Sequence, residues 1–177
     1  MGTDTNDNDS PSKRYGTPVT SKFTHNRSLH HAALCVRDVD ASVRFYRDAI
    51  GLEVLMDHAF EGDWPTLFEA PSRRLRSVFL GDPAGADAGI VELVVFDGST
   101  GDEAGVSPPS RPPRSGFFLL SFFVDVDATL DRLDALGLGG TPRRVEQPGP
   151  SGPVAMATVR DPDGLVVELI QAQEPGA

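Results

Sequence analysis

The sequence contains a single cysteine, Cys35, and no long apolar segment. One cysteine excludes a disulfide within the chain and a zinc site built from several cysteines. No apolar run approaches the roughly 20 residues that a membrane-spanning helix needs, and the N-terminal residues lack the apolar stretch of a signal peptide. We therefore expect a cytoplasmic protein with no membrane partner.

Basic residues are also scarce, with 16 Lys and Arg against 26 Asp and Glu, so the formal net charge is -10. Non-specific binding to a phosphate backbone needs a dense basic patch, and we therefore expect no nucleic-acid partner. The hydrophobic fraction of 39% and the charged fraction of 24% are typical of a soluble globular protein. A length of 177 residues fits one domain.

Two segments lack the apolar periodicity of helices and strands. Residues 1–27 are polar throughout, and we predict a disordered tail there. Residues 98–115 hold four prolines with Gly and Ser, which is typical of a linker. The sequence thus predicts one domain over residues 28–173, divided into a first module (28–97) and a second module (116–173).

The first module has the pattern of a strand, a helix and three further strands. An apolar strand begins near Leu29, and short polar side chains from Asp38 onward can cap a helix that ends at Gly51. Three strands are then predicted at residues 51–60, 74–81 and 89–96. Prolines interrupt the pattern between the first two of these strands, which predicts a loop or short helical turn carrying Trp64 and Phe68.

The second module repeats this order. A strand at residues 117–124 leads to a cap at Asp125 and a helix that ends at Gly137. Three further strands are predicted at residues 142–147, 154–161 and 165–171. The segments DVDASVRFYRDAIGL and DVDATLDRLDALGL share the cap, the apolar stripe of the helix and the closing Gly-Leu, which indicates an internal duplication.

Several short motifs occur in the order found in a known superfamily. They are His31 near the start of a strand, Asp38-Val-Asp40, Phe45-Tyr-Arg-Asp48 with Gly51-Leu52, and Asp161-Pro-Asp-Gly164 followed by Glu168-Leu169. Together they resemble the vicinal oxygen chelate superfamily, which includes glyoxalase I, methylmalonyl-CoA epimerase, extradiol dioxygenases and bleomycin-resistance proteins. The resemblance covers residues 29–172 and implies an α+β fold in which two βαβββ modules form one curved-sheet pocket.

Metal-using members of this superfamily place one ligand on the first strand and one on the last strand of each module. The resemblance assigns these positions to His31, Glu92 and Glu168. The fourth position falls on Leu119 when the strands are aligned on their core residues, or on Phe118 when the helix caps are aligned without a gap. Neither side chain can bind a metal, so the ligand set is incomplete.

The two glutamates are the unusual members of this set. Each lies within an otherwise apolar strand, where a carboxylate is costly unless it is paired, hydrogen-bonded or bound to a metal. One His with two carboxylates suits Zn, Ni, Mn, Fe or Co, and the metal would polarise a substrate carbonyl while Glu168, or else Glu92, moves a proton. The alternative is a lost metal site in which His31 is hydrogen-bonded to a carboxylate.

Other residues are candidates for the pocket wall. Trp64, Phe68, Phe118 and Leu119 would supply apolar surface, and His58 would act as an auxiliary acid or base; ordinary packing is the alternative for each. Five arginines are candidates for an anionic group, with a solvated surface as the alternative: Arg73, Arg74, Arg76, Arg143 and Arg144. We interpret Cys35 as a structural thiol, because no activating motif surrounds it.

Three functions compete. The first is a metal-dependent isomerase, lyase or epimerase of the glyoxalase kind, acting on a small substrate with adjacent oxygens. The second is a metal-free protein that binds a small molecule, as antibiotic-resistance members of the superfamily do. A ring-cleaving extradiol dioxygenase ranks last because it normally needs two histidines, and only His31 is in place. The resemblance also implies a homodimer.

Overall fold

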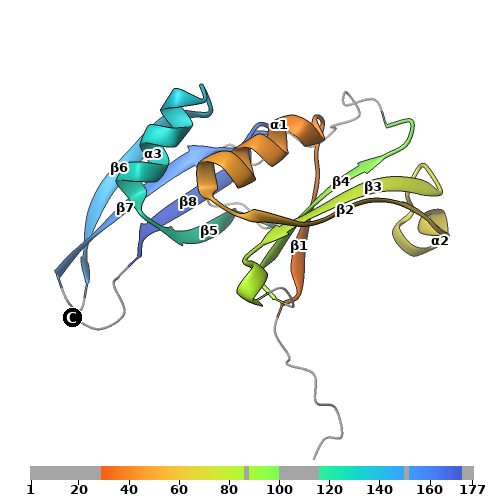
Figure 1. Cartoon of the computed structure of the whole chain (residues 1–177), viewed down its shortest axis with the longest axis horizontal. Helices are drawn as coiled ribbons and strands as arrows, with labels where there is room; N and C mark the ends of the chain where they lie inside the picture. Colours follow the sequence, from red (N-terminus) through yellow and green to blue (C-terminus); the bar gives the residue numbers. More distant parts are fainter. Residues whose placement is uncertain (1–28, 86–87, 100–115, 150–151, 173–177) are drawn as a thin grey trace, which may run out of the picture.

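The computed structural model describes residues 29–85, 88–99, 116–149 and 152–172. The predicted tail and most of the predicted linker lie outside these residues. The fold is α+β as predicted, with two separate four-stranded sheets and short helices (Figure 1). Among the described residues, no helix has the length and apolar character needed to cross a bilayer.

Each module follows the predicted order of elements. The first module comprises β1 (His31–Cys35), α1 (Val39–Val43), the π-helical η1 (Arg44–Ile50), β2 (Glu53–Glu61), α2 (Trp64–Phe68), β3 (Arg74–Gly81), the 3-10 turn η2 (Pro83–Gly85) and β4 (Ile90–Phe96). The second comprises β5 (Leu119–Val124), α3 (Val126–Ala135), β6 (Gly139–Gly149), β7 (Gly152–Arg160) and β8 (Val166–Gln171). The predicted helical turn between the second and third strands is α2.

The two sheets have the same topology, which supports the predicted duplication. Sheet A has the order β1-β4-β3-β2, and sheet B has the order β5-β8-β7-β6. In each sheet the first and last strands of the module pair in parallel at the edge, and the remaining pairs are antiparallel. The residues at the start of β1 and β5 are therefore placed alike beside β4 and β8.

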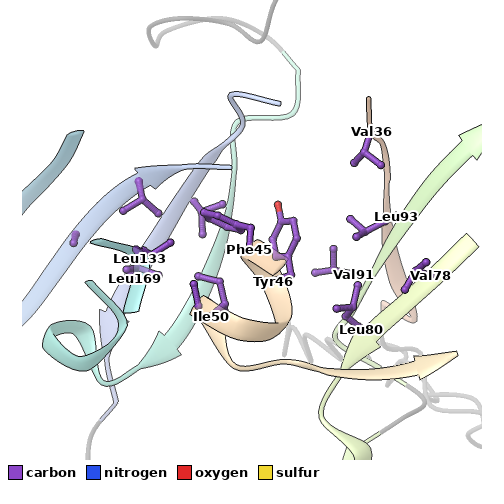
Figure 2. Close-up of a cluster of buried hydrophobic side chains, with 14 of the residues drawn as sticks. Val36, Phe45, Tyr46, Ile50, Val78, Leu80, Val91, Leu93, Leu133 and Leu169 are labelled. Atoms are coloured by element: carbon purple, nitrogen blue, oxygen red, sulfur yellow. The ribbon is translucent and has the colours of Figure 1, made fainter. Parts of the chain in front are cut away.

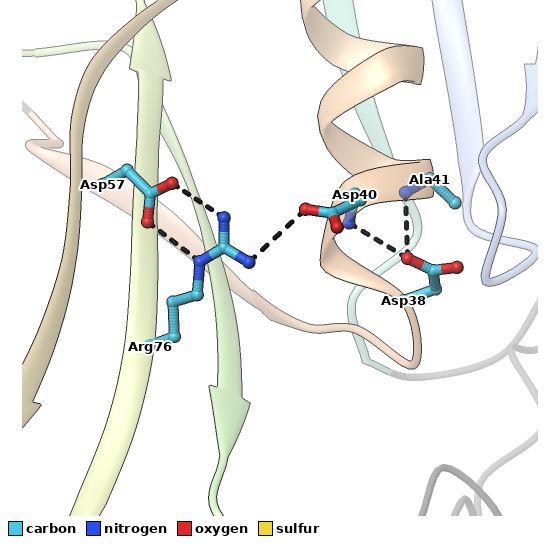
Figure 3. Close-up of polar contacts among 5 residues, drawn as sticks. All are labelled: Asp38, Asp40, Ala41, Asp57 and Arg76. Atoms are coloured by element: carbon cyan, nitrogen blue, oxygen red, sulfur yellow. Dashed lines mark hydrogen bonds and ion pairs between the residues drawn. The ribbon is translucent and has the colours of Figure 1, made fainter.

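The helix caps form as the sequence predicts. The carboxylate of Asp38 accepts hydrogen bonds from the backbone N–H groups of Asp40 and Ala41, each at 3.0 Å (Figure 3). In the second module, Asp125 accepts from the N–H of Ala128 at 3.0 Å. These bonds satisfy donors that would otherwise have no partner in the first helical turn. The first helix ends at Gly51, whose φ of 101° is a left-handed conformation that suits glycine.

One hydrophobic core is shared by both modules. Figure 2 shows Phe45, Tyr46 and Ile50 of η1 lying between the strands of sheet B and those of sheet A. The rings of Phe45 and Tyr46 are fully buried, and so are the sheet residues Val78, Leu93 and Leu169. The helices of the two modules also touch, because the Arg132 guanidinium of α3 donates to the carbonyl of Ala49 at 2.8 Å.

Because the helices and the shared core cover one face of each sheet, the opposite faces are available for a site. In β4, Val91 and Leu93 belong to the core, so Glu92 between them points to the other face of sheet A. In β8, Val167 and Leu169 belong to the core, so Glu168 points to the other face of sheet B. We call these the outer faces of the two sheets.

Sheet A is also joined to α1 by charge. Arg76 on β3 makes two hydrogen bonds to the carboxylate of Asp57 on β2, at 2.9 and 2.7 Å, and a longer one to Asp40 of α1 at 3.4 Å (Figure 3). Arg76 and Asp57 are partly exposed and Asp40 is largely exposed, so the network contributes little to stability.

Candidate functional site

His31 and Glu92 meet on the outer face of sheet A. The parallel register of β1 and β4 places Glu92 opposite Ala33, next along the face from His31. Nε2 of His31 lies 3.1 Å from Oε2 of Glu92. The glutamate side chain is 14% exposed and the histidine side chain is 38% exposed, so the carboxylate lies deeper than the imidazole. The pair can hold a proton between its two members or direct two donors at one ligand.

A serine orients the glutamate from the neighbouring strand. Ser77 of β3 is fully buried, and its hydroxyl donates to Oε1 of Glu92 at 2.5 Å. The imidazole of His31 packs edge-on against Phe79, with ring centres 5.6 Å apart. It also lies within hydrogen-bonding distance of His30, with 2.8 Å between the Nδ1 atoms. His31 and Glu92 therefore have few alternative conformations available.

A cavity of about 580 Å³ opens beside this pair. It is lined by β1, β3 and β4 of sheet A and is covered by the end of α2 and the residues that follow. The lining residues are His31, Ala33, Cys35, Val36, Arg37, Phe68, Glu69, Ala70, Pro71, Leu75, Glu92, Val94, Phe96 and Ser99. All of them belong to the first module or the residues just after it.

Two of the predicted wall residues stand behind or beside this cavity. Phe68 lines it, and the indole of Trp64 stacks on the Phe68 ring with 5.7 Å between the ring centres. Trp64 is not among the lining residues and so supports the wall from behind. His58 is exposed on β2 and packs edge-on against Phe60, outside the cavity lining.

Sheet B carries a related arrangement on its outer face. The Ser121 hydroxyl of β5 donates to Oε2 of Glu168 at 2.7 Å. The register of β5 and β8 places Glu168 opposite Ser121, just as Glu92 lies opposite Ala33 in sheet A. Leu119 therefore occupies the position in sheet B that His31 occupies in sheet A. This register chooses Leu119 over Phe118 as the fourth position, and its side chain offers no donor.

The described chain thus brings two of the three predicted ligands together. His31 and Glu92 are in contact, whereas Glu168 lies on the other sheet and is absent from the lining of the cavity. Within the described residues, no group of three or more His, Cys, Asp or Glu side chains lies close enough to bind one metal ion. The set of three metal ligands therefore stays a prediction, because it requires an arrangement that brings Glu168 next to His31 and Glu92.

Cys35 lines the cavity next to His31 and Glu92, but its side chain favours the protonated thiol over the thiolate. Burial among its neighbours, and then the negative charge of Glu92, raise the pKa of the Cys35 thiol above its ordinary value. A protonated thiol is a poor nucleophile and a poor metal ligand. The raised pKa agrees with the absence of a nucleophilic role, but the Cys35 side chain is exposed, so the expectation of a buried structural thiol is wrong.

The charged side chains considered for an anionic group are largely engaged elsewhere. Four of the five arginines pair with aspartates; the pairs are Arg73 with Asp63, Arg74 with Asp97, Arg76 with Asp57, and Arg144 with Asp127. Arg143 is exposed on β6 of sheet B. None of the five is among the residues that line the cavity.

Sequence reasoning missed the contacts that join the two modules. The buried hydroxyl of Tyr46 donates to Oδ2 of Asp161 at 2.9 Å. Nε of Arg37, a cavity residue, donates to Oδ1 of Asp163 at 2.8 Å, and its NH2 group donates to the carbonyl of Pro162 at 3.1 Å. The Asp161–Gly164 turn of the second module is therefore hydrogen-bonded to the first module beside the cavity.

Sequence reasoning also missed the two serines that hold the glutamates. A signal existed for Ser121, because strand alternation places it on the same face as Leu119. Ser77 gives no such signal, since its role depends on the register between β3 and β4.

Two relatives are similar to this chain in sequence over most of its length. A lactoylglutathione lyase-like protein, terB, of Aspergillus terreus is 38% identical over 154 residues, which cover 83% of this chain and 76% of the relative. A probable lactoylglutathione lyase of Vibrio parahaemolyticus is 28% identical over 153 residues, which cover 86% of this chain and 96% of the relative.

Solved structures show the same fold. A glyoxalase family protein of Bacillus cereus superposes with a TM-score of 0.66 at 17% identity, covering 86% of this chain and 99% of that one. The trypanothione-dependent glyoxalase I of Leishmania major superposes with a TM-score of 0.53 at 23% identity, covering 82% and 87%. Residues 28–169 also match the sequence profile of one family. The chain belongs to the Glyoxalase/Bleomycin resistance protein/Dioxygenase superfamily.

Proposed function

We propose that the protein is a glyoxalase-like isomerase or lyase, which moves a proton between adjacent carbon atoms that carry oxygen. The observation that carries this proposal is the matched placement of His31 with Glu92 on sheet A and of Glu168 on sheet B, each glutamate held by a serine. The names of the relatives from Aspergillus terreus and Vibrio parahaemolyticus agree with this class of reaction.

The donor set fits a divalent metal. Nε2 of His31 and Oε2 of Glu92 point at one another across 3.1 Å, a spacing at which both can also bind the same ion. Ser77 and Ser121 each bind one oxygen of a glutamate, and such outer hydrogen bonds orient metal ligands in proteins. His31, Glu92 and Glu168 would hold the metal, whose positive charge would polarise a substrate carbonyl and acidify the neighbouring C–H bond.

The chain's own groups then perform the proton transfer. Glu168 is the base: it would leave the metal-holding set to do so, with one of its oxygens accepting the Ser121 hydrogen bond and the other taking the proton from the C–H group next to the carbonyl. The same carboxylic acid returns the proton to the adjacent carbon, so no oxidant or reductant is needed. The cavity beside His31 and Glu92 holds the rest of the substrate.

Glu168 reaches the His31–Glu92 pair in a homodimer, in which the outer face of sheet B of one copy covers the outer face of sheet A of the other. Exposed apolar surface supports this arrangement. Phe123 projects from the outer face of sheet B and is 75% exposed, and Phe117 and Phe118, the two residues before β5, are 54% and 47% exposed. Large exposed apolar surface of this kind is typical of an interface.

Metal content tests the donor set. Protein purified without a metal-affinity tag is expected to retain one transition metal per site, measured by elemental analysis. His31→Ala and Glu168→Ala should lose it, whereas Glu146→Ala, a matched change at an exposed glutamate of β6, should keep it. If wild type carries no metal and binds none on titration, the metal-dependent form of the proposal is wrong.

Co-expression tests the shared site. His31→Ala and Glu168→Ala should each abolish exchange of the hydroxymethylene C–H protons of 2-hydroxyacetophenone with D₂O, followed by NMR. When the two variants are co-expressed, a mixed dimer contains one site with both residues intact, so exchange should return. A site within one chain would give no rescue, and that result would refute the two-copy arrangement.

Leu119 favours one alternative, a metal-free protein that binds a small molecule. Leu119 occupies the position in sheet B that His31 occupies in sheet A, so the second module supplies no histidine ligand although its fold is intact. The same leucine counts against the dioxygenase, which needs two histidines. The binding protein would show saturable binding of small molecules and no proton exchange in any of the experiments above.

A further inference from the structure

The cavity on sheet A has a polar end and an apolar end. Because β1 and β4 run parallel, His31 and Glu92 lie near the start of the two strands, and the lining residues further along the strands are Cys35, Val94 and Phe96, with Arg37 and Ser99 just after the strand ends. Leu75 lies opposite Phe96 at the far end, and Phe68 and Pro71 cover the cavity from α2 and the residues after it. A ligand whose oxygens reach His31 and Glu92 therefore places the rest of its body against apolar walls.

The charge of the described lining is unfavourable to anions. Two of the lining side chains are carboxylates, Glu69 and Glu92. The metal of the proposed function would offset the charge of Glu92, so Glu69 is the lining carboxylate that keeps its negative charge. The one arginine among the described lining residues is Arg37, whose guanidinium already donates to Asp163 and to the carbonyl of Pro162. A ligand carboxylate beside Glu69 would lie close to a like charge.

We infer that this cavity takes an uncharged small molecule with an apolar, ring-sized body and two adjacent oxygens at one end, and that it discriminates against anionic thiol conjugates. The inference rests on the proposed function, whose substrate class it narrows. The volume of about 580 Å³ is suitable, since small-molecule sites in proteins typically span about 300–1,000 Å³.

A pair of probes that share a benzene ring separates the two classes. One is 2-hydroxyacetophenone, which is uncharged and has adjacent oxygens; the other is S-benzylglutathione, which carries two carboxylates and one ammonium group and is therefore a net anion. We expect the full-length protein to bind the uncharged probe at least about tenfold more tightly in calorimetric titration, because one uncompensated repulsion of about 1.4 kcal/mol already gives that factor.

Substitutions in the wall locate the binding. Phe68→Ala should weaken binding of 2-hydroxyacetophenone about tenfold, because burial of an aromatic ring contributes about 1.5–3 kcal/mol. Leu67→Ala is the matched control, since Leu67 is on the same helix, is 65% exposed and is not a lining residue. Trp64, the only tryptophan of the chain, stacks on Phe68, so its fluorescence should change when the cavity is filled.

Charge reversal tests the discrimination itself. Glu69→Lys should tighten S-benzylglutathione several-fold, and Glu69→Gln should give a smaller gain, while the uncharged probe changes by less than twofold in both. Equal or tighter binding of S-benzylglutathione by wild type would overturn the inference. Binding of neither probe, or no response of the anionic probe to Glu69→Lys, would overturn it as well.

A failure of this inference can be distinguished from a failure of the proposed function, because binding of the probes and exchange of the proton are measured independently. Tight binding of 2-hydroxyacetophenone without C–H exchange would support the inference and contradict the isomerase. Exchange confined to thiol conjugates of an aryl glyoxal would support the isomerase and contradict the inference.

Discussion

Removing the hydroxyl of Tyr46 should weaken the join between the two modules. Tyr46 is fully buried and donates to Asp161, which is only 6% exposed. The other oxygen of that carboxylate accepts hydrogen bonds from the backbone N–H groups of Asp163 and Leu165. Loss of a hydrogen bond to a charged group costs about 1.5–3 kcal/mol, a substantial part of a typical unfolding free energy of about 5–15 kcal/mol.

The cost of Tyr46→Phe should depend on pH in a definite direction. Burial raises the pKa of Asp161 above its ordinary value, while hydrogen bonds from Leu165 and Tyr46 lower it in part. When the pKa of a carboxyl is higher in the folded than in the unfolded protein, the free energy of unfolding falls as the pH rises from the unfolded pKa to the folded pKa. Without the Tyr46 hydroxyl the folded pKa of Asp161 rises further, so this loss grows.

Tyr46→Phe should therefore cost most at pH values above the folded pKa of Asp161, where the carboxyl is ionised. Below the folded pKa of Asp161 the carboxyl is neutral, and the cost should fall to that of an ordinary hydrogen bond, about 0.5–1.5 kcal/mol. Urea unfolding followed by circular dichroism over a series of pH values measures both limits.

A double-mutant cycle isolates the contact. Tyr46→Phe, Asp161→Asn and the double variant should give a coupling energy of about 1–2 kcal/mol at neutral pH, within the range for residues in direct contact. If the single change costs less than about 0.5 kcal/mol, or costs the same at every pH, the Tyr46–Asp161 bond is not a charged contact that joins the modules.

Three further changes test other parts of the molecule. Gly51→Ala should cost about 1–2 kcal/mol in thermal unfolding, because its φ of 101° strains any side chain, whereas Gly85→Ala, in open space without a left-handed φ, should be close to neutral. Ser77→Ala should lower metal retention about 10–100-fold by releasing Glu92, with little change in fold by circular dichroism; unchanged retention would remove Ser77 from the site. Ser42→Ala should leave stability unchanged or raise it by up to about 1 kcal/mol in urea unfolding, since its buried Oγ has no hydrogen-bond partner among the described residues; a clear loss would reveal a partner.

Local patterns in the sequence were enough to predict the order of elements. The caps at Asp38 and Asp125 and the helix end at Gly51 depend on short-range hydrogen bonds and on glycine's backbone freedom, and all three are confirmed. Strand alternation also separates the two faces correctly, since Ala33 and Cys35 line the cavity with His31. Local departures also occur: the predicted α-helix widens into π-helical turns in η1, the turn η2 was not predicted, and β6 extends beyond the predicted residues 142–147.

The relation between the modules could not be predicted in this way. Tyr46 and Asp161 are 115 residues apart, and neither belongs to a periodic pattern that points at the other. For the same reason the sequence indicates that Glu92 and Glu168 face away from the core without showing that they lie on different sheets. The choice between Leu119 and Phe118 likewise needed the register between β5 and β8.

The shared core has a consequence for how the duplicated halves can exist. Phe45 and Tyr46 lie between strands of both sheets, and buried residues of the two halves form one cluster. A chain cut between Ser99 and Gly116 should yield two fragments that aggregate when made alone and reassemble when made together. The ancestral half-length protein, before its sequence was doubled, would on this view have been an obligate pair, and the fused chain retains that pair as its two inseparable halves.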